Sequence, residues 1–541
     1  MATRMTALTI NGRTVEAIPG PSLFDYAEGL AVQVPTSCKK QGKCKECMVE
    51  VAEGMEYLSE ITEEERHLKG NFRLSCRTTV AGGGAVRCHT MRRGNMRIER
   101  RGFSPGALTL DPAVTRSGDR ILIDGEEIAR SAGGAIHGIA MDLGTTTVVL
   151  RLFNLETGEI AAEASFENPQ RFGGSDVMAR IQYDTDNRGK LLMRTLAGYL
   201  SHAIEEFPVD PRTIYEMVVV GNSTMRDLFF GLSVYTIGQS PYRSITEIEM
   251  ADTSLISTGR RCLLPIHPNA RVYGGPIVSG HVGADAAACM LAVDLAHEER
   301  TVAIMDIGTN TELIVGNQGR ILAASCPAGP AFEGGAIACG MPALDGAIEN
   351  VVIDSDGAFH FGVIGGGAPE GICGSGLVSL LSELIRTGRM NSLGRFEDGE
   401  HRITLDAKRN IFFTESDVNE LAQAKGANVA GLHVVSSQYG LDFDDIGVFY
   451  LGGGFGRHLS VQASQHIGLI PNVAETRIVQ VGNAAIEGAS IALLSKTKRR
   501  ELEELVRRVE HCRLETHPRF FDFFVEGCQF KPVESMSKVA A

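Results

Sequence analysis

The stretch Met141-Asp142-Leu143-Gly144-Thr145-Thr146-Thr147 decides the fold, because it returns about 160 residues later as Met305-Asp306-Ile307-Gly308-Thr309-Asn310-Thr311. Each copy lies between apolar runs, which predicts a strand, a tight turn and a second strand. A glycine in such a turn lets backbone N–H groups approach phosphate oxygens, and neighbouring hydroxyl groups donate further hydrogen bonds. The repeat therefore predicts two similar lobes that grip phosphate groups from both sides.

Three pieces of sequence together predict a nucleotide site. The stretch Val448 to Gly456 is a strand that runs into bare glycine backbone, which leaves room for a base or ribose. The chain lacks Gly-x4-Gly-Lys-Ser/Thr and Gly-x-Gly-x-x-Gly in a first βαβ unit, so P-loop and Rossmann sites are excluded. The predicted ATP-binding residues are Gly144, Thr145, Thr146, Gly308, Thr309, Asn310, Gly452, Gly453 and Gly454.

Carboxylates beside these turns are the predicted catalytic residues. Asp142 and Asp306 end the two apolar strands, where each can hold Mg²⁺ through water or orient the attacking water. Glu333 lies in a Gly-rich stretch and can act as a base or hold the same ion through water. The alternative for Glu333 is a carboxylate that only stabilises the start of a helix.

The N-terminal cysteines predict a metal centre. Their pattern is Cys38-x5-Cys44-x2-Cys47, followed by Cys76, and four thiolates suit a 2Fe–2S cluster. A structural zinc site also takes four cysteines, but zinc usually uses a Cys-x2-Cys pair on both sides and the second half here supplies only Cys76. We therefore favour iron and sulfide, with the loop lysines Lys39, Lys40, Lys43 and Lys45 offsetting the cluster's negative charge.

The predicted order of domains is a small α+β domain, a linker and a two-lobed α/β domain. In the first, Ala7–Ile10 and Arg13–Ile18 flank an Asn-Gly pair and predict a hairpin. Hairpin, helix and cysteine loop in this order resemble the β-grasp ferredoxins. We expect the ferredoxin domain at residues 1–92, the linker at 93–137 and the second domain at 138–541, with its second lobe starting near residue 300.

Composition and charge exclude several classes of function. A formal net charge of −14 over 541 residues argues against nucleic-acid binding, which needs a basic face. No apolar run is long enough to cross a bilayer, and the first residues lack the pattern of a signal peptide. We therefore expect a cytoplasmic protein with no membrane partner.

The three nucleotide motifs resemble the phosphate-1, phosphate-2 and adenosine motifs of the acetate and sugar kinase, heat-shock chaperone and actin superfamily (ASKHA, with a ribonuclease-H-like fold). With the cysteine loop added, the whole chain is similar to the reductive activators of corrinoid (cobalamin) proteins. Further stretches carry this resemblance: 168–170, 174–177, 220–225, 282–285, 371–376, 482–489 and 520–532.

This resemblance implies an ATP-hydrolysing iron–sulfur activase with a 2Fe–2S cluster, ATP and Mg²⁺ as cofactors. It would pass one electron to Co(II) of a corrinoid protein and restore Co(I) for methyl transfer. ATP would close the lobes, and a long linker would let the ferredoxin domain swing. The implied partners are an upstream reductase and the corrinoid protein of a methyltransferase system in one-carbon metabolism or of a split methionine synthase; a homodimer stays open.

Two departures from the family pattern leave alternatives open. The segment between the domains has room only for a linker and a short hairpin, so we expect the extra middle domain of some members to be missing, and Cys528 alone in the tail cannot ligate a 4Fe–4S cluster. One alternative is an activator of another low-potential enzyme. Another is a ferredoxin electron carrier with a regulatory nucleotide-binding domain, and ATPase assays with and without a corrinoid protein separate these functions.

Overall fold

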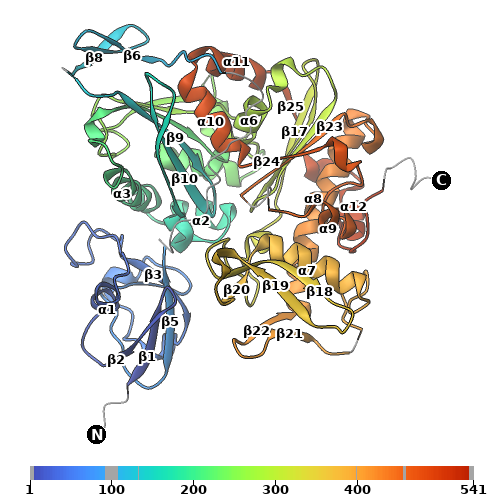
Figure 1. The fold of residues 1–541 in the computed structure, drawn as a ribbon. Helices are drawn as coiled ribbons and strands as arrows, with labels where there is room; N and C mark the ends of the chain where they lie inside the picture. Colours follow the sequence, from blue (N-terminus) through green and yellow to red (C-terminus); the bar gives the residue numbers. More distant parts are fainter. Residues whose placement is uncertain are drawn as a thin grey trace.

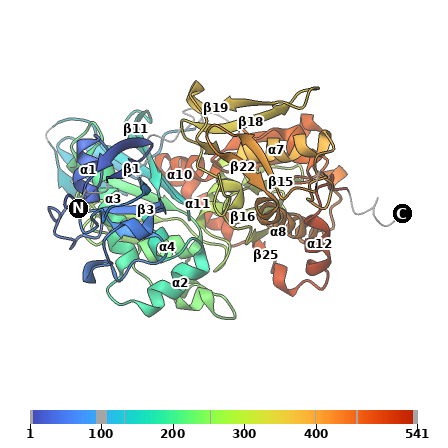
Figure 2. The same ribbon diagram turned by 90° about the horizontal axis from the view of Figure 1, so that it is seen from below.

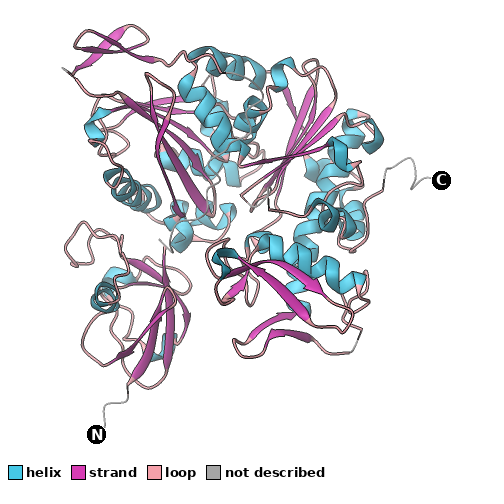
Figure 3. Cartoon of the chain, viewed as in Figure 1, coloured by secondary structure: helices cyan, strands magenta, loops and turns pink. Residues whose placement is uncertain are grey.

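The computed structural model describes residues 5–91, 108–131, 133–250, 252–397, 399–454 and 458–534. A small N-terminal domain lies beside one large lobe, and a second lobe faces the first (Figure 1). Figure 3 shows that helices and strands alternate through both lobes. None of the helices in the described ranges is long and apolar enough to span a membrane.

The N-terminal domain is a five-stranded sheet in the order β2-β1-β5-β3-β4. Asn11 and Gly12 have positive φ angles of 48° and 77°, which places the predicted Asn-Gly turn between β1 and β2. Ser22 and Asp25 form a capping box at the start of α1, and Leu23 and Ala27 bury the helix against the sheet. The elements are β1 (Thr6–Ile10), β2 (Arg13–Ala17), α1 (Leu23–Gly29), β3 (Met48–Glu53), β4 (Phe72–Leu74) and β5 (Ala85–Thr90).

A three-stranded antiparallel sheet follows in the segment where we predicted a linker. It consists of β6 (Val114–Ser117), β7 (Arg120–Ile123) and β8 (Glu126–Arg130). Val114 and Ile121 are fully buried in a core shared with the first lobe, so this part of the chain is packed. Residues 93–107 of the predicted linker lie outside the described residues.

The two lobes are built on sheets with the same plan, as the repeated motif predicts. Three antiparallel strands come first, and two parallel strands then extend the sheet from its first strand. The first sheet has β9 (His137–Leu143), β10 (Thr147–Asn154), β11 (Ile160–Glu167), β12 (Ile214–Val220), β13 (Leu255–Thr258) and β14 (Arg271–Gly274). The second has β15 (Val302–Asp306), β16 (Thr311–Gly316), β17 (Ile321–Cys326), β23 (Val448–Gly452), β24 (Ile478–Gly482) and β25 (Val509–His511).

Two helices join the lobes: α6 (Ala284–Ala292) and α10 (Ala484–Leu494) lie between the two sheets (Figure 1). They touch backbone to backbone, since a Cβ atom on Gly488 would come within 2.0 Å of the Ala288 carbonyl oxygen. Residues from both sheets and both helices share one apolar core. Motion between the lobes must therefore pivot near this contact.

The remaining elements cover the outer faces of the lobes. Figure 2 shows the N-terminal domain on the side of the first lobe, away from α8 and α12 of the second. The first lobe carries α2 (Val177–Asp186), α3 (Leu191–Glu205), α4 (Ser223–Phe229) and α5 (Ile245–Glu249). The second carries β18 (Ala347–Ile353), β19 (Phe359–Val363), β20 (Gly371–Ile372), α7 (Gly374–Arg386), β21 (Arg402–Asp406), β22 (Ile411–Thr414), α8 (Glu415–Tyr439), α9 (Val461–His466) and α12 (Phe520–Gly527). The last helix, α11 (Lys496–Val506), packs beside α6 and α10, and its Arg499 pairs with Glu216 of the first lobe.

Candidate active site

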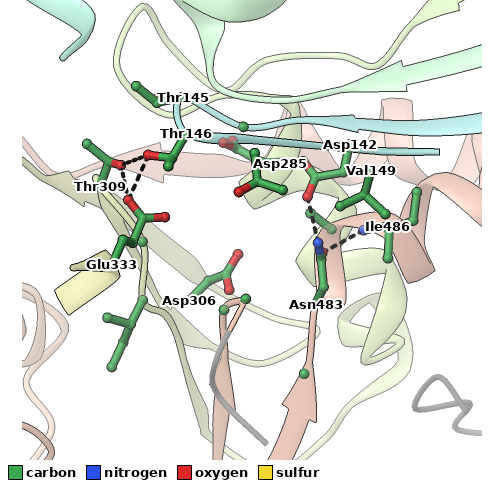
Figure 4. A pocket seen from close by; sticks show the side chains of 18 of the residues that line it. Asp142, Thr145, Thr146, Val149, Asp285, Asp306, Thr309, Glu333, Asn483 and Ile486 are labelled. Carbon is green, nitrogen blue, oxygen red and sulfur yellow. Dashed lines mark hydrogen bonds between the residues drawn. The ribbon is translucent and has the colours of Figure 1, made fainter. Parts of the chain in front are cut away.

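A cavity of about 250 Å³ opens between the two lobes, at the turns β9–β10 and β15–β16 (Figure 4). Of the predicted nucleotide and catalytic residues, eleven line it: Asp142, Gly144, Thr145, Thr146, Asp306, Gly308, Thr309, Asn310, Glu333, Gly453 and Gly454. Gly452 lies behind the wall, where a Cβ atom would come within 2.7 Å of Asp306 Oδ1. Residues 455–457, which follow the glycine run, are outside the described residues.

Hydroxyl groups from both lobes meet on one carboxylate. Thr146 of the first lobe and Thr309 of the second lie 2.9 Å apart, measured between their Oγ1 atoms. Both donate to Glu333 Oε2, Thr146 over 2.9 Å (Figure 4). The groups predicted to bind phosphate are therefore engaged by an internal anion in this structure.

Each motif aspartate is held by a side chain from the opposite half of the cleft. Asn483, at the start of α10, donates to Asp142 Oδ2 over 2.7 Å. The buried thiol of Cys289 on α6 lies 3.3 Å from Asp306 Oδ2 and donates to it. The second oxygen of Asp306, Oδ1, is buried without a hydrogen-bond partner in the described part of the chain.

Acidic side chains dominate the described wall of the cavity. Arg151 is the only Lys or Arg among the described residues that line it, and Arg151 is paired with Glu163 and Glu487. The carboxylates that line the same wall are Asp142, Asp285, Asp306, Glu312, Glu333 and Glu487. Carboxylate oxygens are the ligands that Mg²⁺ prefers, and the unpartnered Asp306 Oδ1 fits such an ion or a water bound to it.

Burial of these carboxylates disfavours their charged forms. Burial raises the pKa of Asp142 to about 7; the Asp306 charge adds to the shift and the Asn483 amide opposes it. Burial raises the pKa of Asp306 to about 6, with the Glu333 charge adding to the shift and the Cys289 thiol opposing it. Burial also raises the pKa of Asp285 to about 7. A bound divalent cation would return these groups to their ionised forms.

Several of these residues had no role in the sequence analysis. Asp285 and Asn483 were noted only for family resemblance, and Glu312 and Cys289 were not assigned to the site. Asp285 follows the N-cap of α6, and Glu312 follows the second Asp-x-Gly-Thr turn on β16. Apart from the resemblance, the sequence signal for Asp285 and Glu312 is an acidic residue just beyond a Gly-rich turn. That pattern is too common to identify a site residue.

The four predicted cluster ligands lie together on the N-terminal domain. The Sγ atoms of Cys47 and Cys76 are 3.3 Å apart, while Cys38 and Cys44 interact at the other end of the loop. Although burial opposes it, the amides of Cys44, Lys43 and Gln41 lower the pKa of Cys38 to about 7. These amides point at sulfur, as expected for a loop that stabilises thiolate ligands.

The spread of the four sulfur atoms favours a two-iron cluster over zinc. In a tetrahedral zinc site the four sulfurs lie about 3.8 Å from one another. Among the described residues, no three cysteine sulfurs lie within 4.8 Å of one another. The close pair Cys47 and Cys76 beside the interacting Cys38 and Cys44 fits two irons, each of which takes two cysteines.

The cysteine loop is seated on the first lobe. Glu46, between two ligands, is buried, and its carboxylate accepts from Ser37 over 2.7 Å and lies 3.0 Å from His202 Nε2 of α3. The Tyr199 hydroxyl on α3 donates to the Glu46 carbonyl oxygen over 2.6 Å. Buried hydrogen bonds and an apolar core shared with Cys47 therefore dock the ferredoxin domain on the first lobe in this structure, and the swing that the resemblance implied stays a prediction.

Three family models match the chain. Residues 8–81 match the 2Fe–2S iron–sulfur cluster binding domain, residues 137–298 the RACo middle region, and residues 300–540 the C-terminal domain of RACo, the ASKHA domain. These matches bear out the 2Fe–2S domain and the actin-like fold. The expected absence of a middle domain is wrong, because the segment that forms the first lobe is what matches the middle region.

Named relatives are similar over most of the chain. The corrinoid activation enzyme RamQ of Eubacterium limosum is 32% identical over 425 residues, which is 73% of this chain and 70% of that protein. The Co(II) methylated amine-specific corrinoid protein reductase of Methanosarcina barkeri is 24% identical over 72% of this chain and 76% of its own. A solved reductive activator for corrinoid, iron–sulfur protein has a TM-score of 0.73 at 25% identity and covers 98% of both chains.

Proposed function

Because the chain belongs to the RACo family, we propose that it is an ATP-dependent activase that reduces Co(II) of a corrinoid protein to Co(I). The observation that carries the proposal is that the first lobe contacts both reactive centres. The first phosphate loop and the cysteine loop are both seated on the first lobe, the latter through Glu46. A change at the nucleotide can thus reach the electron donor without an intervening flexible linker.

We assign the nucleotide to the cavity between the lobes. The turns at Gly144–Thr146 and Gly308–Asn310 face it from both sides and supply amide and hydroxyl donors for phosphates. Gly453 and Gly454 line the part of the wall next to the start of α10, where bare backbone leaves room for the base or ribose. This division gives each predicted ATP-binding stretch its own part of the ligand.

We assign Mg²⁺ to the acidic side of the same cavity. Asp306 Oδ1 and Asp142 are the groups that would hold the ion through water or orient the attacking water. Glu333 accepts from Thr146 and Thr309, so phosphate oxygens must displace it from these hydroxyls before it can act as a base. The ion would offset both the phosphate charge and the carboxylates, since the described wall has no free Lys or Arg.

The electron transfer is uphill and therefore needs ATP. When bound, the 2Fe–2S cluster supplies one electron at low potential. Each step of about 59 mV against a one-electron transfer costs a factor of ten in the equilibrium constant, so a gap of a few hundred millivolts needs several kcal/mol. Closure of the lobes on ATP and opening after hydrolysis supply that energy by changing how the corrinoid protein is held.

The test is single-turnover reduction of a Co(II) corrinoid protein by the reduced, cluster-loaded protein with and without ATP. We expect Co(I) to form only with ATP, and Asp306→Asn to keep the cluster's visible spectrum but to lose the ATP-dependent formation of Co(I). Asp522→Asn, which changes an exposed carboxyl on α12, is the matched control. Full activity of Asp306→Asn would refute the assigned site, and reduction without ATP would refute the proposed function.

We extend the proposal to the partners. The corrinoid substrate is the small corrinoid protein of a methyltransferase system or a methionine synthase without its own reactivation domain, and a separate reductase reloads the cluster. Pull-down with purified candidates of both kinds separates them. Size-exclusion chromatography with light scattering tests whether the active form is a homodimer.

A further inference from the structure

One short segment touches both the phosphate loop and the ferredoxin domain. Residues Glu167–Gly174, here the connector segment, run from the end of β11 through a short 3₁₀ helix (Pro169–Gly173) toward α2. The sequence singles out Asn168–Gln170 only by family resemblance, and the proposed function gives these residues no role. Their hydrogen bonds connect the first phosphate loop with the ferredoxin domain.

The first end of the connector segment is tied to the phosphate loop. Asn168 is fully buried, and its Nδ2 donates to the Gly144 carbonyl oxygen over 2.8 Å. The backbone N–H of Asn168 donates to the Thr146 carbonyl oxygen over 2.7 Å. The Asn168 side chain also accepts from the Gln170 N–H over 2.9 Å, which caps the 3₁₀ helix. One residue thus fixes both the loop and the start of the segment.

The far end of the connector segment returns to the same loop. Arg180 of α2 is fully buried; its Nε donates to the Gly174 carbonyl oxygen over 3.0 Å and its Nη2 to the Thr145 carbonyl oxygen over 2.6 Å. With Asn168 at one end and Arg180 at the other, the segment follows the position of the loop. A shift of the loop on phosphate binding must move the segment or break these buried bonds.

The middle of the connector segment is tied to the ferredoxin domain. Arg171 forms two 3.3 Å contacts with the Glu50 carboxylate on β3. The Lys69 N–H donates to the Phe172 carbonyl oxygen over 3.1 Å. The Phe172 ring also packs edge-on against His67, with centroids 5.7 Å apart. Three residues of the ferredoxin domain are thus bound to two neighbouring residues of the segment.

We propose that the connector segment transmits the nucleotide state of the cleft to the ferredoxin domain, with Asn168 and Arg171 as positioning residues. The proposal rests on the proposed function, because it takes the cleft to bind ATP. Asn168 and Arg171 are three residues apart, and Pro169 and the 3₁₀ hydrogen bonds stiffen the chain between them. A displacement at the phosphate loop is therefore passed to Glu50 and Lys69 with little loss.

The test is hydrogen–deuterium exchange on the full-length, cluster-loaded protein, with and without a Mg²⁺-bound, non-hydrolysable ATP analogue. The Lys69 amide is a direct reporter, since it donates across the interface to the connector segment. In the wild type we expect the nucleotide to slow exchange in the peptide that covers residues 66–72 by about threefold or more. Slower exchange is expected because a ligand that fixes the phosphate loop also fixes the contacts attached to it.

Two variants and one control locate the route. Asn168→Ser keeps a capping oxygen but is too short to reach Gly144, and Glu50→Gln removes the charge that Arg171 binds. In both we expect less than half of the wild-type response, and Glu50→Gln should leave basal ATP hydrolysis unchanged. Glu53→Gln is the matched control, because Glu53 lies on the same strand and pairs with Arg87 inside the ferredoxin domain. We expect it to respond as the wild type does.

The outcomes separate the two proposals. A wild-type response that survives in both Asn168→Ser and Glu50→Gln would overturn the connector as the route, as would the absence of a response in protein that demonstrably binds the analogue. Failure of the wild type to bind the analogue by calorimetry would overturn the proposed function itself. A normal cluster spectrum in each variant shows that a lost response is not a loss of folding.

Discussion

The two phosphate loops share a sequence motif, yet different parts of the molecule hold them. The first loop, at residues 144–146, is anchored by Asn168, Arg180 and Asn222, all from its own lobe. The second loop, at residues 308–310, is anchored through Thr309 to Glu333 and Gly329, while its aspartate depends on Cys289 across the cleft. The first loop is thus held within the lobe that carries the ferredoxin domain, whereas the second loop is held by the Gly329–Glu333 segment of the other lobe.

The largest effect should come from comparing the two aspartates. We expect Asp306→Asn to lower kcat for ATP hydrolysis by about a hundredfold or more, because its free Oδ1 has no substitute among the described residues. Asp142→Asn should cost about tenfold less, since among the described residues Asp306 has a buried carboxylate oxygen without a hydrogen-bond partner and Asp142 has none. Steady-state phosphate release measures kcat for both variants. Equal losses would contradict the proposed difference between the two aspartates.

The next effect concerns stability and its dependence on pH. The folded-state pKa of Asp285, about 7, is above its ordinary value of 3.8, so its contribution to stability is present below about pH 4 and is lost as pH rises through 7. Asp285→Asn should therefore stabilise the nucleotide-free protein at pH 8 by about 1–3 kcal/mol relative to wild type, and by little at pH 4.

Urea unfolding at the two pH values measures this change. Glu312→Gln is the corresponding variant in the second lobe. It should also stabilise the protein at pH 8, because burial raises the pKa of Glu312 as well. Adding Mg²⁺ should reduce the advantage of both variants over wild type. A variant that is less stable than wild type at pH 8 would contradict the expected cost of burying these carboxylate charges in the cleft.

A smaller effect is expected for Glu333, whose carboxylate accepts hydrogen bonds from hydroxyl groups of both lobes. Glu333→Gln keeps the shape of the side chain but weakens its hold on Thr146 and Thr309. If Glu333 acts only by competing with phosphate, KM for ATP falls and kcat is kept; if it is also a base, kcat falls by about tenfold or more. Initial rates over a range of ATP concentrations separate these results, with Glu420→Gln on α8 as an exposed control.

The smallest effect should come from Cys289. Removing its thiol in Cys289→Ala should raise the Mg²⁺ concentration needed for half-maximal ATP hydrolysis by about threefold, because Asp306 loses the donor that orients it. Cys289→Ser retains a donor and should stay close to wild type. Equal behaviour of the two variants would show that Cys289 only fills space beside the pivot.

The sequence predicts the parts of the site that depend on local geometry. The Asp-x-Gly-Thr turns and the cysteine loop each need a glycine or a ligand at a fixed spacing, and such spacing is visible in one dimension. The Asn-Gly hairpin of the N-terminal domain is predictable for the same reason. The two-lobed plan follows from the repeat, since equal sequences in equal contexts fold alike.

The contacts between distant elements could not be predicted in this way. Cys289 reaches Asp306, and Asn483 reaches Asp142, only because α6 and α10 pack between the sheets. The seat of Glu46 on α3 depends on a shared apolar core that no local pattern indicates. For residues 114–130 the sequence indicates only a short hairpin in a linker; the third strand and the packing against the first lobe could not be predicted, because the buried partners are distant in sequence.

The position of the cysteine loop against the first lobe also determines which side of the metal centre is open to solvent. Cys47 is completely buried against the first lobe, whereas Cys38, Cys44 and Cys76 are partly open to solvent. Within the described residues, the side of the metal centre that solvent reaches is the rim formed by these three cysteines, where Lys39 and Lys43 are exposed. In the proposed cycle the reductase and the corrinoid protein would use the same approach to the cluster, so reloading and discharge would be separate steps.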